Sequence, residues 1–141
     1  MRYYDNKSDK CIVCPLALKY NNVSTNYSIV EAESPTEYVI KTCGGIDLII
    51  TDSKNKTYLT EVKPKNSKET IVRMIAEIYT YTIGFEGEKE IAFFEGSQQE
   101  KDYKKYYNNK YFRKIIDKVT VFKFVEKEGA NGIVNFEIVK L

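Results

Sequence analysis

The chain has 141 residues, of which 43% are hydrophobic and 30% are charged, and its formal net charge is +2. This length and composition are typical of one globular domain with its own core, so we expect residues 1–141 to form a single domain. The net charge alone is too small to indicate nucleic-acid binding. The sequence has no histidine, which excludes Ser-His-Asp triads, Cys-His proteases and histidine zinc sites. An enzyme with this composition would work with carboxylates, lysine and tyrosine.

The three cysteines are an odd number for a small chain, so a disulfide framework is not expected. Cys11 and Cys14 have the spacing of half a zinc site or of a redox pair, but zinc would need further ligands from Cys43 and carboxylates. Buried reduced thiols are the simpler interpretation. The longest apolar run, at 11–18, is too short to cross a membrane, and the first residues do not form a signal peptide. We therefore expect a cytoplasmic protein with no membrane partner.

The first third of the chain predicts short elements. Residues 11–20 fit either a buried strand or a helix that begins near Pro15, since proline is tolerated only in the first turn of a helix. After this segment we expect a loop at 21–26, strands at 27–32 and 37–42, and a turn between these strands at 34–36.

The stretch at 44–64 predicts a β-hairpin, because two segments rich in β-forming residues flank a polar turn. If the turn is centred near Lys54, Asp47 lies directly across from Glu61. Side chains alternate along a strand, so Asp47, Glu61 and Lys63 then share one face of the sheet. Two opposing carboxylates destabilise a ladder unless a cation lies between them. Oxygen ligands suit Mg²⁺ or Mn²⁺, and Lys63, roughly 7 Å along the strand from Glu61, would reach an anion bound to the metal.

The segment after the hairpin predicts an amphipathic helix that ends near Gly84. Either Asn66, in a capping box with Glu69, or Ser67 would cap its start. Its buried stripe would consist of Ile71, Ile75, Ile78 and Thr82, flanked by Val72 and Tyr79. Further along we expect a short strand at 91–94, a second helix at 101–118, and strands at 119–125 and 133–139 joined by a turn at 129–132.

An aspartate, a turn and then Glu-x-Lys resembles the motif of the PD-(D/E)XK, or restriction-endonuclease-like, nucleases. The match consists of Gly45-Ile46-Asp47 and Glu61-Val62-Lys63, and the resemblance covers about residues 37–95, with Ile46 where the family has proline. It implies an α/β fold with a mixed central sheet flanked by helices, built on a βββαβ core with extensions. It also implies hydrolysis of phosphodiester bonds with Mg²⁺ or Mn²⁺, with DNA the favoured substrate.

The resemblance also implies a set of metal ligands. Asp47 and Glu61 would bind one or two Mg²⁺ ions, with the carbonyl of Val62 as a further ligand. Family members often carry an additional acidic residue upstream that completes the metal shell. Here Glu31 is the favoured candidate, with Glu33 and Glu37 as alternatives.

Lys63, by the same resemblance, would position the attacking water and stabilise negative charge at the phosphate. The RecB-like branch of the family has a Gln-x-x-x-Tyr motif after Glu-x-Lys, which Glu77 and Tyr81 match with glutamate in place of glutamine. These two residues would orient Lys63 or the substrate. The alternative is a surface ion pair between Arg73 and Glu77 beside a half-buried tyrosine.

Basic residues and tyrosines are interleaved in the helix predicted at 101–118. Basic side chains neutralise phosphates, and tyrosine rings stack on unpaired bases. The alternative is a solvated amphipathic helix whose apolar side chains pack on the core. The candidate nucleic-acid contacts are Lys65, Lys68, Arg73, Lys104, Lys105 and Arg113.

Two other interpretations of the chain remain open. One is a catalytically inactive module with a nuclease fold that binds nucleic acid or a protein partner, although an intact Asp/Glu/Lys set argues against it. The other is an unrelated α/β protein, which predicts no metal binding and no clustering of Asp47, Glu61 and Lys63. So short a chain has little room for a domain that reads sequence, so we expect structure-directed cutting, a homodimer or a larger complex.

Overall fold

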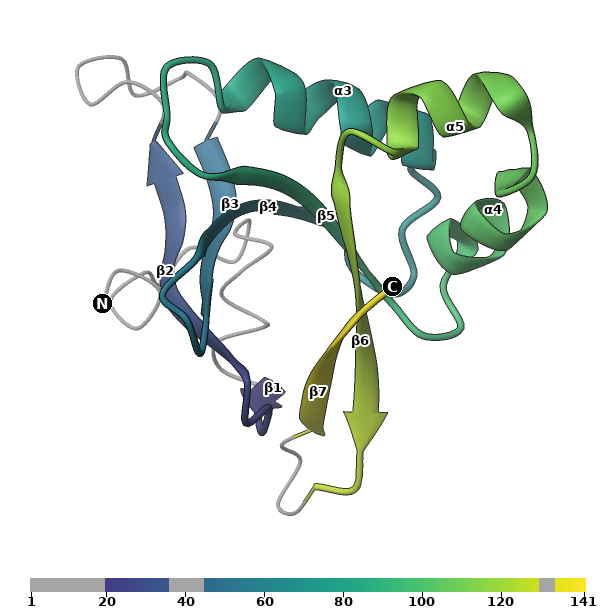
Figure 1. Ribbon diagram of the computed structural model, residues 1–141. Helices are drawn as coiled ribbons and strands as arrows, with labels where there is room; N and C mark the ends of the chain where they lie inside the picture. The colour runs from purple at the N-terminus through teal and green to yellow at the C-terminus, as the bar shows by residue number, and fades with distance from the viewer. Residues whose placement is uncertain (1–19, 36–44, 130–133) are drawn as a thin grey trace.

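The computed structural model describes residues 20–35, 45–129 and 134–141. They form one mixed sheet of seven strands with three helices, which confirms the predicted α/β class (Figure 1). In chain order the elements are β1 (Tyr20–Asn22), β2 (Tyr27–Pro35), β3 (Gly45–Asp52), β4 (Thr57–Val62), α3 (Ile71–Tyr81), β5 (Glu88–Phe94), α4 (Gln98–Tyr106), α5 (Lys110–Ile116), β6 (Thr120–Lys127) and β7 (Val134–Lys140). None of the helices in this part of the chain is long and apolar enough to cross a membrane.

The strand order in the sheet is β1-β7-β6-β5-β4-β3-β2. Strands β2, β3 and β4 form an antiparallel meander, β4, β5 and β6 are parallel, and β7 is antiparallel to β6 and parallel to β1. The two outermost strands, β1 and β2, are joined by only the short segment 23–26. The sheet is therefore strongly curled, as Figure 1 shows, and the rings of Tyr27 in β2 and Phe122 in β6 lie 4.8 Å apart although three strands separate them.

Each face of the curled sheet has its own apolar core. On the outer face, buried residues of α3 and α5 pack against Leu59, Ile91 and Phe93. On the inner face, ten buried side chains from five strands pack together without a described helix: Leu48, Ile50, Tyr58, Val62, Ala92, Phe94, Phe122, Phe124, Phe136 and Ile138. The three described helices thus lie over the outer face, which is where the hairpin presents Asp47 and Glu61.

The predicted apolar stripe of α3 is confirmed. All four of its members are buried, and Met74, one turn along the same side, is buried with them. The start of the helix was predicted too early, because its N-cap is Thr70, whose hydroxyl accepts the N–H of Arg73 at 3.2 Å. Ser67 instead serves the preceding loop, where its hydroxyl accepts the N–H of Glu69 at 3.1 Å, so the capping box at Asn66 is wrong.

Two helices, α4 and α5, replace the single helix predicted at 101–118. The side-chain oxygen of Asn109 accepts the N–H groups of Tyr111 at 2.9 Å and Phe112 at 3.1 Å. This cap starts a new helix and ends the previous one. The first of the two also begins before the predicted start, because Ser97 caps it.

Strand β2 is longer than the strand predicted at 27–32 and runs through Pro35. The turn predicted at 34–36 is therefore wrong for its first two residues. As an edge strand of the sheet, β2 tolerates proline, because its outer N–H groups have no ladder partner. The loop predicted at 21–26 begins later, since its first two residues belong to β1. Strand β5 is longer than predicted, and the antiparallel pair β6–β7 is confirmed.

Some predictions fall outside the described residues. They are the strand at 37–42, the elements at 11–19, the turn at 129–132 except for its first residue, and the roles of Cys11, Cys14 and Cys43.

Candidate active site

The hairpin of β3 and β4 has the predicted register. Its ladder pairs Leu48 with Thr60, and one further step along both strands sets Asp47 opposite Glu61. Directly opposed residues share a face of a sheet. The pair therefore lies at the end of the ladder away from the turn, on the outer face.

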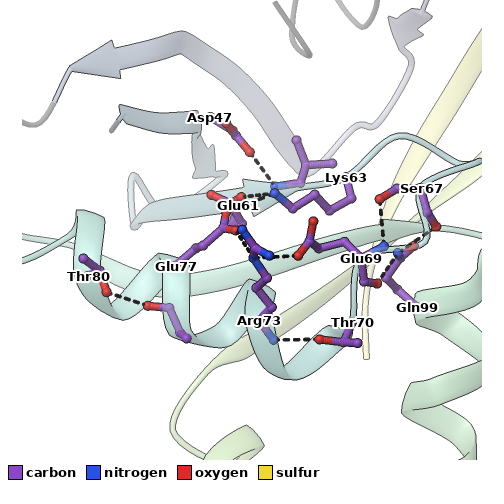
Figure 2. Close-up of polar contacts among 12 residues, drawn as sticks. Asp47, Glu61, Lys63, Ser67, Glu69, Thr70, Arg73, Glu77, Thr80 and Gln99 are labelled. Atoms are coloured by element: carbon purple, nitrogen blue, oxygen red, sulfur yellow. Dashed lines mark hydrogen bonds and ion pairs between the residues drawn. The ribbon is translucent and has the colours of Figure 1, made fainter. Parts of the chain in front are cut away.

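Four ionisable side chains converge at this end of the hairpin. The carboxylate of Asp47 accepts the backbone N–H of Val62 through Oδ2 at 3.0 Å. The ammonium of Lys63, just beyond β4, lies 2.9 Å from Oε1 of Glu61 and 3.0 Å from Oε2 of Glu77 in α3. Figure 2 shows these side chains pointing toward one another from the hairpin and the helix. We refer to Asp47, Glu61, Lys63 and Glu77 as the carboxylate–lysine cluster.

Most of this cluster is shielded from solvent. Glu61 is 2% exposed and Lys63 is 9% exposed. Charged groups are rarely buried without partners, because losing hydration costs several kcal/mol per ion. The mutual contacts of Glu61, Glu77 and Lys63 supply those partners.

Burial and crowding of like charges determine the protonation of the cluster. Burial, the hydrogen bond with Glu77 and the charge of Asp47 raise the pKa of Glu61 to about 9. The same hydrogen bond lowers the pKa of Glu77, so the proton that these two carboxyl groups share stays with the more buried Glu61. Burial also raises the pKa of Asp47 to about 6, against the opposing N–H of Val62. Burial lowers the pKa of Lys63, but the two glutamates outweigh it and raise that pKa overall, so Lys63 stays charged.

Arg73 lies at the rim of the cluster. Its Nε is 2.7 Å from Oε1 of Glu69 and 3.3 Å from Oε1 of Glu77, and its side chain is 68% exposed. The ion pair between Arg73 and Glu77 considered from the sequence is thus present. Glu69 was not expected to join it, although its spacing of four residues before Arg73 is a signal for such a pair.

The segment between Lys63 and α3 is held by Gln99 from α4. The Gln99 amide is buried, and its Nε2 donates hydrogen bonds to the carbonyl oxygens of Ser67 at 3.1 Å and Glu69 at 2.7 Å (Figure 2). No sequence signal predicts this contact, because it joins residues about thirty positions apart. Gln99 fixes the segment that carries Glu69 and hence the partner of Arg73.

Tyr81, the last residue of α3, lies one turn beyond Glu77 and is half-buried. Its hydroxyl makes no hydrogen bond with another residue in the described part of the chain. The helix spacing places it on the same side as Glu77, as predicted. Its role in orienting Lys63 or a substrate stays a prediction.

The upstream acidic residues Glu31 and Glu33 lie in β2, beside β3. The ladder pairs Glu31 with Ile49, two positions from Asp47. Glu33 falls between the pairs Ala32–Leu48 and Ser34–Ile46, which sets its position opposite Asp47. A β-bulge after Ile29 produces this register. A bulge of this kind is not readable from the sequence, which favoured Glu31.

The predicted nucleic-acid contacts form two groups. Lys65 and Lys68 are exposed in the segment before α3, and Lys65 lies 3.4 Å from Glu126. Arg73, the third member of this group, is exposed in the first turn of α3. The second group is on α4 and α5, where Lys104 lies 3.8 Å from Glu100, Lys105 lies over the ring of Tyr106, and Arg113 pairs with Asp117 at 3.1 Å.

The donor set of the cluster suits a hard divalent cation. The carboxylates of Asp47 and Glu61 and the carbonyl of Val62 are oxygen donors of the kind that Mg²⁺ and Mn²⁺ prefer. Three carboxyl groups and one ammonium leave a shortage of positive charge, which is one cause of the raised pKa of Glu61. Within the described ranges, no group of three or more Asp, Glu, Cys or His side chains is arranged to hold a metal ion. Water would have to complete the coordination, as it usually does for Mg²⁺.

Comparison with known proteins gives no relative: no family model, no curated protein and no solved structure matches the chain.

Proposed function

We propose that the protein is a metal-dependent nuclease of the restriction-endonuclease-like class that hydrolyses phosphodiester bonds, with DNA as the favoured substrate. The observation that carries this proposal is the convergence of Asp47, Glu61 and Lys63 at one end of a hairpin, joined by Glu77 from the next helix. The order β2-β3-β4-α3-β5 is a βββαβ arrangement, which supports the finer assignment of the fold.

Each member of the cluster would have its own role in hydrolysis. Asp47, Glu61 and the Val62 carbonyl would hold Mg²⁺ or Mn²⁺, and such an ion acidifies a bound water and neutralises charge on a phosphate. Lys63 stays charged, so its ammonium donates hydrogen bonds to an oxygen of the scissile phosphate as negative charge develops. Glu77 holds Lys63 in position through the 3.0 Å contact.

The rim of the cluster suits a polyanion. Arg73 is exposed beside Glu77, and Lys65 and Lys68 are exposed in the adjoining segment. These three cations would contact phosphates on either side of the scissile bond. Sequence specificity would come from a second copy of the chain or from a larger complex.

A second candidate is a catalytically inactive module that binds nucleic acid or a protein. One observation favours it: the Lys63 ammonium is enclosed by Glu61 and Glu77 rather than presented to a phosphate. In this interpretation the cluster is a buried ion-pair network that orients α3 against the hairpin.

Cleavage of labelled single- and double-stranded DNA with Mg²⁺ or Mn²⁺ separates the two candidates. The variants are Asp47→Ala and Lys63→Ala, and Lys54→Ala in the exposed hairpin turn is the matched lysine control. We expect metal-dependent cutting by the wild type and by the control, and a loss of at least about 100-fold in the two cluster variants. Cutting that persists in Lys63→Ala would refute the proposed mechanism. A wild type that neither cuts nor binds metal in calorimetry would refute the nuclease proposal and favour the inactive module.

A further inference from the structure

A second cluster, of exposed tyrosines and basic residues, lies on α4, α5 and the turn between them. Three tyrosines there are exposed: Tyr106 by 39%, Tyr107 by 41% and Tyr111 by 65%. Cations lie over all three rings: Lys110 and Lys114 are 5.0 Å and 5.8 Å from the ring centre of Tyr111, Lys105 is 5.3 Å from that of Tyr106, and the Arg113 guanidinium is 4.4 Å from that of Tyr107. We refer to the three tyrosines together with Lys105, Lys110 and Lys114 as the tyrosine–lysine surface.

Basic residues outnumber acidic residues on these two helices. Residues 98–118 contain seven basic and three acidic residues, a net charge of +4 in a chain whose total is +2. The three acids already have partners: Glu100 with Lys123, Asp102 with Gln98, and Asp117 with Arg113. Within the described ranges, five lysines of the segment have no ion pair: Lys101, Lys105, Lys110, Lys114 and Lys118. The free charge of this surface is therefore positive and complements a polyanion.

Ring packing accounts for three tyrosines of the segment. Tyr103 packs against Phe93 of β5 with ring centres 5.7 Å apart, Tyr107 packs on Tyr103 at 5.4 Å, and Tyr106 packs on Phe112 at 6.0 Å. Tyr111 packs on no other aromatic ring of the described residues. Tyr111 lies beneath its two lysines, and its hydroxyl has no hydrogen-bond partner among the described residues. An exposed aromatic ring beside free ammonium groups offers a stacking face and phosphate contacts at the same place.

We propose that the tyrosine–lysine surface binds single-stranded nucleic acid, with bases stacked on Tyr111 and its neighbours and phosphates held by the lysines. A duplex hides its base faces in its own stack, so exposed rings select unpaired nucleotides. The conclusion that single-stranded nucleic acid is the substrate of the carboxylate–lysine cluster rests on the proposed nuclease function. Binding of a single strand to the tyrosine–lysine surface does not depend on that function.

The tyrosine–lysine surface and the carboxylate–lysine cluster belong to neighbouring elements on the outer face of the sheet. Gln99 in the first turn of α4 holds the carbonyls of Ser67 and Glu69, in the segment that follows Lys63. Figure 2 shows Gln99 beside Ser67 and Glu69 of this segment. These contacts hold the first turn of α4 against the segment that carries Lys65 and Lys68, two exposed cations that could contact phosphates of a strand bound on α4 and α5.

Fluorescence anisotropy tests the inference, with a labelled oligothymidylate and a labelled duplex of equal length, in chelator so that no cutting occurs. We expect the wild type to bind the single strand more tightly than the duplex. Tyr111→Ala should weaken single-strand binding about tenfold, whereas Tyr111→Phe, which keeps the ring, should bind like the wild type. Lys110→Gln with Lys114→Gln should reduce the slope of log Kd against log salt by about 0.7 for each phosphate that the protein no longer neutralises.

The control is Lys54→Gln, which removes an exposed lysine in the hairpin turn and should change neither quantity. Unchanged binding by Tyr111→Ala, or tighter binding of the duplex than of the single strand, would overturn the inference. Either result would leave the cleavage test of Lys63→Ala unaffected. Conversely, binding through Tyr111 by a protein that does not cut would uphold this surface and refute the nuclease proposal.

Discussion

Glu61 and Glu90 lie on neighbouring strands and are both buried, but they face opposite sides of the sheet. The β4–β5 register pairs Glu61 with Ile91 of the outer core, and Thr60 with Glu90. Glu61 lies among an ammonium and two further carboxyl groups. Glu90 has one polar partner, the hydroxyl of Thr60, which donates to its Oε1 at 2.6 Å, and its Oε2 has no hydrogen-bond partner among the described residues.

The difference shows that burial alone does not indicate a functional carboxylate. Burial in an apolar environment is the main cause that raises the pKa of Glu90 well above its ordinary value, and this favours its neutral form. Glu61 also has a raised pKa, but like-charged neighbours contribute to it and a lysine opposes it. The concentration of opposing charges, rather than the shifted pKa, makes the outer face the candidate site.

The same substitution on the two faces gives the largest predicted contrast. Glu61→Gln should reduce metal-dependent DNA cleavage by about 1,000-fold, because it removes a metal ligand and a partner of Lys63. Glu90→Gln should leave the rate near that of the wild type, because an amide replaces a neutral acid of the same shape. Initial cleavage rates measured side by side check this. Equal losses in both variants would mean that the two faces do not differ in function.

Removing the cluster's ammonium should cost stability. Lys63→Met leaves the buried Glu61 without its cation and leaves Glu77 with Arg73 alone, so the free energy of unfolding should fall by about 3 kcal/mol. The matched control is Lys56→Met, which breaks an exposed pair with Glu88 at 2.8 Å and should cost much less, because an exposed ion pair is well solvated and screened. Urea denaturation followed by circular dichroism measures both. Similar losses in the two variants would contradict the buried network.

Glu90 should make the free energy of unfolding depend on pH, and Glu90→Gln should remove this dependence. Its folded-state pKa is raised above the ordinary value of 4.5, so the stability it contributes is present below that value and is lost as pH rises through the folded pKa. The free energy of unfolding should fall with rising pH by at most about 1.4 kcal/mol per unit from this group. Urea denaturation at about pH 6 and about pH 8 should show a shallower decline in Glu90→Gln than in the wild type. Parallel declines would show that Glu90 is not buried as a neutral acid.

The smallest effect is expected at the rim. Arg73→Gln removes an exposed guanidinium from Glu69 and Glu77, so the free energy of unfolding should change by less than about 1 kcal/mol. The change should shrink further in high salt, because exposed charges are screened. Thermal melts at low and high salt check this. A larger, salt-independent loss would show that Arg73 belongs to the buried network rather than to its rim.

Much of the hairpin was predictable because its determinants are local. Asp52 accepts the N–H groups of Lys54 and Lys56 at 2.9 Å each, and Asn55 adopts a φ of 61°, which asparagine tolerates. These turn residues set the centre of the hairpin, and the register follows from it. Alternation along the strands then places the acidic pair on one face.

Other features have no such local determinant. Glu90 follows two charged residues and reads as the polar end of a short strand, yet the parallel pairing of β5 with its neighbours extends the strand and buries it. Gln99 is an ordinary helical residue until the fold brings the segment at 64–70 against α4. The cap at Asn109 did have a local signal, but the continuous apolar and basic pattern of 101–118 obscured it.

By itself the sequence determined the mixed α/β class, the β3–β4 hairpin, the buried stripe of α3, and the placing of Asp47, Glu61 and Lys63 on one face. These depend on periodicity and turn chemistry, which act over a few residues. The tertiary structure decided the curl of the sheet, the pairing of β1 with β7, the register of β2 against Asp47, the isolation of Glu90, and the attachment of α4 beside the cluster. These depend on contacts between distant parts of the chain, whose energies are set by packing and burial in the assembled fold and leave no pattern in any short segment.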